Sequence, residues 1–171
     1  MLRLQIPDPS LILLIGSSGA GKSTFAARHF KPTEIVSSDR CRAAICDDEN
    51  DQSVNYAAFG LLRHITRARL SLRRLTVIDA TNLETRARRG LLRVAGIYQI
   101  PAVAIAFNVP LEKCLEQNLT RTGRVVKDEV LSYHAAQFER AISRLDREGY
   151  AQIHRLDETN VNDVVVDRVR G

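Results

Sequence analysis

Short apolar runs alternate along the chain with longer amphipathic segments, and this alternation predicts an α/β domain. We expect five strands, each bounded by turn residues or a charged break, at residues 11–15, 34–37, 75–79, 102–108 and 152–156. In a mainly parallel sheet, ligands gather at the carboxyl ends of the strands. The residues that follow each apolar run are therefore the first candidates for a functional site.

The longer segments between these runs carry apolar residues at helical spacing, and helices are expected there. Their predicted ranges are 21–29, 52–71, 84–96, 111–120, 127–148 and 160–169. The 171 residues contain no internal repeat or low-complexity tract, and 44% of them are hydrophobic. Together these features predict one domain over residues 1–171, with a five-stranded, mainly parallel sheet flanked by helices.

The chain lacks the signals of export and of membrane insertion. It begins without a basic region followed by an apolar stretch, and no window approaches the ~18 apolar residues of a membrane span. We therefore expect a cytoplasmic protein without a membrane partner. Cys41, Cys46 and Cys114 are odd in number and fit no zinc template, so they are predicted to be packing or surface thiols.

The charge balance bears on possible partners. A net charge of +5 and an isoelectric point near 9.4 suggest a polyanion, although a modest excess of arginine also occurs on surfaces that bind nothing. Four arginines of one predicted helix pose the same choice between a nucleic-acid backbone and a solvated face, with the solvated face favoured. They are Arg86, Arg88, Arg89 and Arg93.

The first apolar run breaks into a glycine-rich turn that matches the phosphate-binding loop (P-loop) template G-x-x-x-x-G-K-[ST]. Glycines let the backbone turn tightly and bring bare N–H groups onto phosphate oxygens, and the following helix adds positive potential. Lys22 is predicted to reach the β- and γ-phosphates, and Ser23 to offer its hydroxyl to Mg²⁺. The predicted triphosphate-binding residues are Gly16, Ser17, Ser18, Gly19, Ala20, Gly21, Lys22, Ser23 and Thr24.

Asp39 follows the second predicted strand, at the edge of the sheet where the γ-phosphate would point. It could accept a proton from an acceptor hydroxyl, or it could cap the next helix, and the sequence leaves both open. Arg42 lies on the same face if this segment is helical, where it could bind an anionic group of the acceptor or face water.

The third predicted strand ends in Asp79-Ala-Thr-Asn82, an arrangement typical of the metal-side element of a P-loop enzyme. Asp79 is predicted to order Mg²⁺ through water, or the loop itself. Thr81 or Asn82 could also cap the following helix, and the two functions are compatible.

Residues 111–124 predict an amphipathic helix that delivers Arg121 and Arg124 at its end. Guanidinium groups on a segment that closes over a nucleotide stabilise the migrating phosphoryl group, so we expect a helical lid. The competing interpretation is the ordinary preference of arginine for a helix C-terminus. His134, in the next predicted helix, is expected in the core or at its boundary.

The combination of residues 16–24, 38–42, 47–52, 79–82 and 121–130 closely resembles the kinase module of bacterial polynucleotide kinase-phosphatase, an RNA repair enzyme. The P-loop alone is shared by many families, whereas Ser-Ser-Asp-x-x-Arg together with Asp-Ala-Thr-Asn is far more restrictive. The resemblance covers nearly the whole chain. It implies transfer of the γ-phosphate of ATP or another NTP, with Mg²⁺, to 5′-hydroxyl ends of RNA or DNA.

The same resemblance implies roles for individual residues. Asp39 is similar to the general base, and Arg42 to a clamp on the phosphate 3′ to the terminal nucleoside. Gln52 and Val130 resemble positions that sandwich the terminal base of the acceptor. Thr81 is also predicted to bind the acceptor. Where the family has an arginine early in its lid this chain has Gln117, so Arg121 is expected to contribute more, assisted by Arg124. The family module is the N-terminal part of a homodimeric kinase, phosphatase and ligase polypeptide, which implies that residues 1–171 are one module of a longer protein.

Two other classes of function share this loop. A P-loop kinase of a small metabolite or nucleoside uses the same chemistry on a different acceptor. A nucleotide-dependent switch or motor ATPase would bind the triphosphate without transferring it to an acceptor, but the third strand ends in Asp-Ala rather than Asp-Glu and no Asn-Lys-x-Asp guanine reader is present.

Overall fold

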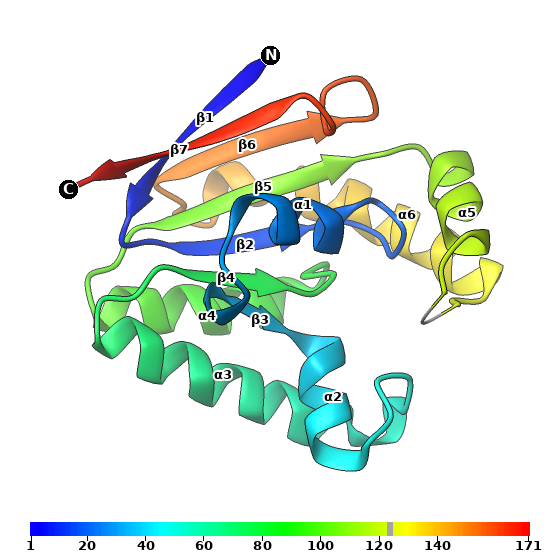
Figure 1. The fold of residues 1–171 in the computed structure, drawn as a ribbon, viewed down its shortest axis with the longest axis horizontal. Coiled ribbons are helices and arrows are strands. Elements are labelled where there is room, and N and C mark those ends of the chain that lie inside the picture. The colour runs from blue at the N-terminus through cyan, green and yellow to red at the C-terminus, as the bar shows by residue number, and fades with distance from the viewer. Residues whose placement is uncertain (123–124) are drawn as a thin grey trace.

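A computed structural model describes residues 1–122 and 125–171, and within these ranges the main sheet has five strands in the order β3-β4-β2-β5-β6 (Figure 1). All of its strand pairs are parallel. The strands are β2 (Leu11–Ile15), β3 (Ile35–Ser37), β4 (Thr76–Asp79), β5 (Ala102–Asn108) and β6 (Gln152–Asp157). The predicted fold class and the five predicted strands are therefore confirmed.

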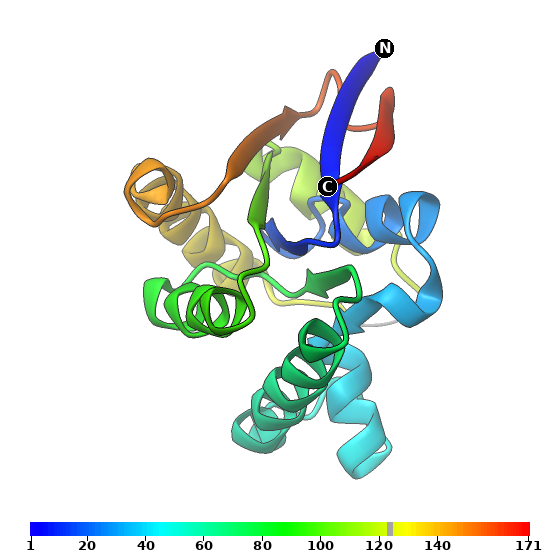
Figure 2. The same ribbon diagram turned by 90° about the vertical axis from the view of Figure 1, so that its left-hand side faces the viewer.

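Helices connect the strands and cover both faces of the sheet (Figures 1 and 2). They are α1 (Lys22–His29), α2 (Ser38–Cys46), α3 (Asn55–Ser71), α4 (Thr85–Ile97), α5 (Leu111–Leu119) and α6 (Asp128–Ile142). Short 3₁₀ turns lie at Pro32–Glu34, Gln52–Val54 and Leu145–Arg147. None of the helices in the described ranges is long and apolar enough to cross a membrane.

Each face of the sheet has its own hydrophobic core, because side chains alternate along a strand. On β2, Leu11, Leu13 and Ile15 pack toward α3, α4 and α6, whereas Ile12 and Leu14 pack toward α1. All five are fully buried. Burying an apolar strand on both faces stabilises it by roughly 1.5–3 kcal/mol per large side chain, which holds the strand end that carries the P-loop.

The structure differs from the sequence-based expectation at both chain ends. Residues 160–169 were expected to be helical, but β7 (Val164–Arg170) is a strand that pairs in parallel with β1 (Leu2–Asp8) in a separate two-stranded sheet. The predicted helix is therefore wrong. Three consecutive valines at 164–166 favour a strand because β-branched side chains pack well on a pleated surface.

Two smaller differences concern helix boundaries. The segment predicted as one helix over 127–148 ends at Ile142, and a 3₁₀ turn follows at Leu145–Arg147. Residues after β3 form α2 directly, a helix that the predicted ranges did not include, and Asp39 lies in its first turn. The carboxyl ends of β2, β3 and β4 consequently bring the P-loop, Asp39 and Asp79 to one edge of the sheet.

Candidate active site

The P-loop joins β2 to α1 and has the backbone conformation that its glycines permit. Gly19 and Gly21 have φ of 80° and 93°, in the left-handed region that L side chains rarely adopt. A Cβ on Gly19 would lie 2.7 Å from the carbonyl oxygen of Cys114 on α5. The loop is also held at its start, because Gly16 N donates to Thr81 O at 3.0 Å. Only glycine fits at position 19, which keeps α5 close to the loop.

Lys22 is the central cation of the loop and is almost completely buried, with 7% exposure. Its Nζ donates to the carbonyl oxygens of Gly16 and Ser17 at 2.8 and 2.6 Å. Burial lowers the pKa of Lys22 to about 8, an effect that the nearby Asp79 opposes and the nearby Arg121 reinforces. An ammonium so poorly solvated gains strongly from an anion in place of the two carbonyls.

Ser23, the first hydroxyl after Lys22, donates from Oγ to Asp79 Oδ2 at 2.7 Å. Asp79 ends β4 and is 8% exposed. The two oxygens form the donor set that Mg²⁺ prefers when it also binds phosphates and water. In the described ranges, no group of three or more His, Cys, Asp or Glu side chains could hold a metal ion.

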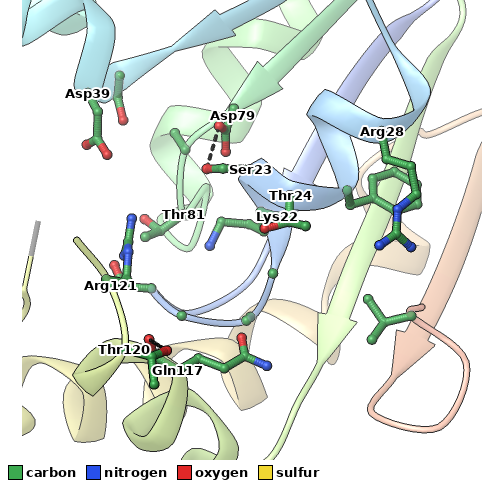
Figure 3. Close-up of a pocket in the computed structure, with 18 of the residues that line it drawn as sticks. Lys22, Ser23, Thr24, Arg28, Asp39, Asp79, Thr81, Gln117, Thr120 and Arg121 are labelled. Atoms are coloured by element: carbon green, nitrogen blue, oxygen red, sulfur yellow. Dashed lines mark hydrogen bonds between the residues drawn. The ribbon is translucent and has the colours of Figure 1, made fainter. Parts of the chain in front are cut away.

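Asp39 lies in the first turn of α2 and lines the same cavity as Lys22 and Ser23. The helix is capped by Ser37, whose Oγ accepts from Arg40 N at 3.3 Å. The sequence left open whether Asp39 accepts a proton or caps the helix, and the structure shows that Ser37 is the cap. The Asp39 side chain retains 27% exposure and points into the site from the β3 side (Figure 3).

Arg42, one turn further along α2, is 3% exposed and bonds within the chain through three nitrogens. Nη2 donates to the Asp39 carboxylate, Nε to Glu49 O at 2.7 Å, and Nη1 to Asn55 Oδ1 at 3.0 Å. These contacts join Asp39 to the loop that precedes α3. Arg42 does not line the cavity, and its predicted contact with an acceptor phosphate stays a prediction.

The end of α5 supplies the opposite wall of the cavity through Gln117, Thr120 and Arg121 (Figure 3). Asn118, which is 1% exposed, donates to Val126 O at 2.7 Å and accepts from Val126 N at 2.8 Å. This paired contact fixes Val126 against the end of α5, close in sequence to Arg121. Arg124, also predicted to bind the nucleotide, lies outside the described residues.

The cavity has a volume of about 360 Å³ and brings together most of the predicted site. Gly16 and Ser17 do not line the cavity, but their carbonyl oxygens accept hydrogen bonds from Lys22. Thr81 lines the cavity. Gln52 and Val130 lie on the surface outside it. The residues predicted to line it and found there are Ser18, Gly19, Ala20, Gly21, Lys22, Ser23, Thr24, Asp39, Asp79, Thr81 and Arg121.

Sequence reasoning missed a second group of lining residues, Arg28, Val161 and Asn162. Arg28 Nη1 donates to Asn162 O at 3.2 Å, joining α1 to the loop between β6 and β7. Val161 and Asn162 were not predicted at the site because residues 160–169 were expected to form a helix. His134, expected in the core or at its boundary, is half-buried on α6 and accepts from P-loop Ser18 N through Nδ1 at 3.4 Å.

Two residues at the base of α4 also differ from expectation. Arg88 was grouped with a solvated face, but it is fully buried, pairs with Glu148 at 2.5 Å and donates to Asn82 O and Leu83 O. Asn82 does not cap α4; its Nδ2 donates to Leu14 O at 2.7 Å and joins the ends of β4 and β2. Asn82 thus fixes the end of β4 against the end of β2, and Arg88 holds the backbone of Asn82.

Comparison with solved structures shows the same fold in several proteins. A chain in the Pnkp1/Rnl/Hen1 RNA repair complex has a TM-score of 0.68 and 23% identity over 81% of this chain and 46% of that chain. A putative kinase from Chloroflexus aurantiacus has a TM-score of 0.65 and 16% identity over 92% of both chains. At these identities the likeness shows the fold, and this chain spans less than half of the RNA repair chain.

A third solved structure, the APS kinase CysC of Mycobacterium tuberculosis in complex with AMPPNP and APS, has a TM-score of 0.53 and 17% identity over 67% of this chain and 70% of that chain. No curated protein sequence matches the chain. A family model described as an AAA domain (AAA_33) matches residues 11–147, which include every strand of the main sheet except β6. The chain therefore belongs to this AAA domain family and has a P-loop kinase-like, nucleotide-binding fold.

Proposed function

We propose that the chain is a polynucleotide 5′-hydroxyl kinase that transfers the γ-phosphate of ATP or another NTP to 5′-OH ends of RNA or DNA. The observation that carries this proposal is that Asp39 lines one cavity with Lys22 and Ser23, and that Arg121, just after α5, lines the same cavity. A carboxylate beside a triphosphate cradle supplies an acceptor-side base, a group that a switch or motor ATPase does not need in this position.

The residues divide the reaction between them. The P-loop amides and Lys22 hold the β- and γ-phosphates, and phosphate oxygens replace the carbonyls of Gly16 and Ser17 at Nζ. Ser23 and Asp79 would hold Mg²⁺, which supplies positive charge to the phosphate oxygens when bound. Arg121 adds a second cation on the opposite side of the cavity.

Asp39 orients the acceptor 5′-hydroxyl and takes its proton as the oxygen attacks the γ-phosphorus. The P–O bond to the β-phosphate breaks as the new P–O bond forms, and the nucleoside diphosphate leaves. Arg42 holds the Asp39 carboxylate from behind through its ion pair, with its own position fixed by Glu49 O and Asn55. The base is thereby oriented before the acceptor arrives.

The choice of a polynucleotide acceptor rests on three supports. The motifs around Asp39 and Asp79 resemble the polynucleotide kinase module, and a chain of an RNA repair complex has the same fold. The chain also carries a net charge of +5. Other proteins with this fold include the APS kinase and a gluconokinase from Sinorhizobium meliloti, so the acceptor must be tested directly.

The test offers Mg-ATP labelled at the γ-phosphate with four acceptors in parallel: a 5′-OH oligonucleotide, a nucleoside 3′-phosphate, a nucleoside and gluconate. We expect label at the 5′ end of the oligonucleotide, with a kcat/KM far above that of the other three. Preferred labelling of the nucleoside or of gluconate would instead establish a small-molecule kinase. ATP hydrolysis without label on any acceptor would favour an ATPase.

A further inference from the structure

The positive charge of the chain is concentrated in one stretch of the sequence. Residues 52–100 contain nine arginines, no lysine and only two acidic residues, Asp79 and Glu84. Of these two, Asp79 belongs to the candidate active site and Glu84 precedes α4. The helices α3 and α4 themselves contain no acidic residue. The net charge of this stretch alone exceeds the net charge of +5 of the whole chain.

Two of the nine arginines are explained by structure. Arg69 is half-buried and donates to Leu75 O at 2.8 Å and to Thr76 Oγ1 at 3.2 Å, which joins α3 to β4. Arg88 is fully buried and pairs with Glu148. Neither is available to a ligand.

The other seven arginines are exposed and form no side-chain hydrogen bond or ion pair within the described ranges. On α4, Arg86, Arg89 and Arg93 follow i, i+3, i+7 spacing and lie on one face of the helix. On α3, Arg63 and Arg67 are one turn apart. The exposed arginines of this stretch, called the arginine surface below, are Arg63, Arg67, Arg73, Arg74, Arg86, Arg89 and Arg93.

This arrangement costs stability. Like charges at i, i+3 or i, i+4 on a helix destabilise it by about 0.2–0.5 kcal/mol per pair, and no acidic side chain on α3 or α4 compensates. The pairs Arg63–Arg67, Arg86–Arg89 and Arg89–Arg93 all have such spacing. A polyanion that binds along the helices removes the repulsion.

The arginine surface begins beside the candidate active site. Helix α3 begins three residues after Gln52, and α4 begins four residues after Thr81, which lines the cavity. The two helices lie side by side on the same face of the sheet (Figures 1 and 2). Arg86 to Arg93 spans about 10 Å along α4, which matches about three phosphates of one nucleic-acid strand.

From these observations we infer that the arginine surface binds the phosphodiester backbone of the acceptor polynucleotide beyond its terminal nucleotide. The inference rests on the proposed function, because it assigns the path of that acceptor. Arginine contacts to phosphates carry no sequence information, so the surface selects acceptors by length and charge and not by base. A long acceptor is therefore held in two places, at its 5′ end by the cavity and along its backbone by the two helices.

The test compares two triple variants that remove equal charge. Arg86→Gln/Arg89→Gln/Arg93→Gln removes the α4 row, and Gln keeps its helix propensity. The control, Arg3→Gln/Lys31→Gln/Arg170→Gln, removes the same charge outside α3 and α4, with Arg3 and Arg170 on the β1–β7 sheet at the opposite side of the molecule (Figure 1). Of these three, Arg3 pairs with Asp167 at 2.9 Å. Binding of a fluorescent 5′-OH oligonucleotide of about 20 nucleotides is measured by anisotropy without ATP, over a series of salt concentrations.

The α4 variant is expected to bind the oligonucleotide at least about tenfold more weakly at low salt, with a slope of log K against log salt smaller by about 2, because each lost contact to a single strand removes about 0.7. The control variant keeps the wild-type slope. With a nucleoside 3′-phosphate as acceptor, the α4 variant keeps the wild-type kcat/KM. Its thermal unfolding temperature is unchanged or raised, which a structural role for these arginines would not give.

The outcomes separate this inference from the proposed function. If the α4 variant binds the oligonucleotide more weakly and with the smaller salt slope while the control does not, but the wild-type protein does not phosphorylate the oligonucleotide, the arginine surface stands and the kinase assignment fails. If the α4 variant and the control bind the oligonucleotide equally, the inference is overturned whatever the activity. Equal loss of transfer to the long and the short acceptor would also overturn it.

Discussion

Arg42 donates from Nη2 to Oδ1 of Asp39, and the same guanidinium is anchored to Glu49 O and Asn55 Oδ1. The carboxylate of the candidate general base is thus held by a cation that is itself 3% exposed. A buried guanidinium with several partners has little freedom to turn toward a ligand. The geometry therefore favours Arg42 as a positioning residue for Asp39.

Arg42→Gln is accordingly expected to impair both folding and turnover. Loss of the buried contacts lowers the free energy of unfolding by about 2–4 kcal/mol. The value of kcat falls to a similar extent with a nucleoside and with its 3′-phosphate, because Asp39 loses its orientation for both. Denaturant unfolding and parallel kinetics check the prediction. A loss confined to the 3′-phosphorylated acceptor would show instead that Arg42 binds the acceptor phosphate.

The lowered pKa of Lys22 predicts that ATP binding depends on pH. Its pKa is lowered to about 8 by burial, so about half of the unliganded protein carries a neutral amine at that pH. A bound triphosphate raises this pKa again, and binding takes up about half a proton near pH 8. ATP affinity is therefore full below this pH and decreases as the pH rises through it.

Calorimetry in two buffers of different ionisation enthalpy measures this uptake. Lys22→Met is the control, since methionine has a similar length and cannot titrate. Proton uptake that is absent in the wild type, or that persists in Lys22→Met, would contradict the assignment.

Arg121 lines the cavity opposite Asp39 and sits close enough to Lys22 for its charge to lower the lysine pKa. Arg121→Ala is expected to lower kcat by about 10² to 10³, because the lost contact strengthens as charge develops on the migrating phosphoryl group. The affinity for ATP changes less. Single-turnover rates compared with equilibrium ATP binding test this asymmetry. A near-native rate in Arg121→Ala would show that Arg121 only follows the ordinary preference of arginine for a helix C-terminus.

The sequence was sufficient to predict much of the fold and of the donor site, because both depend on local patterns. Apolar runs predicted the five parallel strands, and the glycine and lysine spacing predicted the loop in which Gly19 and Gly21 have positive φ. Asp39 and Asp79 were found at the cavity because parallel strands end at the same edge.

Contacts between distant segments were beyond the reach of such patterns. The pairing of β1 with β7 joins the two ends of the chain, and the wrong helix at 160–169 hid the wall formed by Val161 and Asn162. In sequence Arg88 resembles the exposed Arg86 and Arg89, but it is buried because it pairs with Glu148, sixty residues away, and donates to Asn82 O and Leu83 O. The paired contact between Asn118 and Val126 likewise joins residues that no local pattern relates.

The most direct test of the account compares Asp39→Asn with the wild type in single-turnover transfer from γ-labelled Mg-ATP to a 5′-OH oligonucleotide. Asparagine is nearly isosteric but cannot take the hydroxyl proton. We expect the label at the 5′ end of the wild-type product, a transfer rate at least about 10²-fold lower for Asp39→Asn, and unchanged calorimetric ATP binding. A native transfer rate in Asp39→Asn, or loss of ATP binding together with activity, would contradict the assignment of Asp39 as the general base.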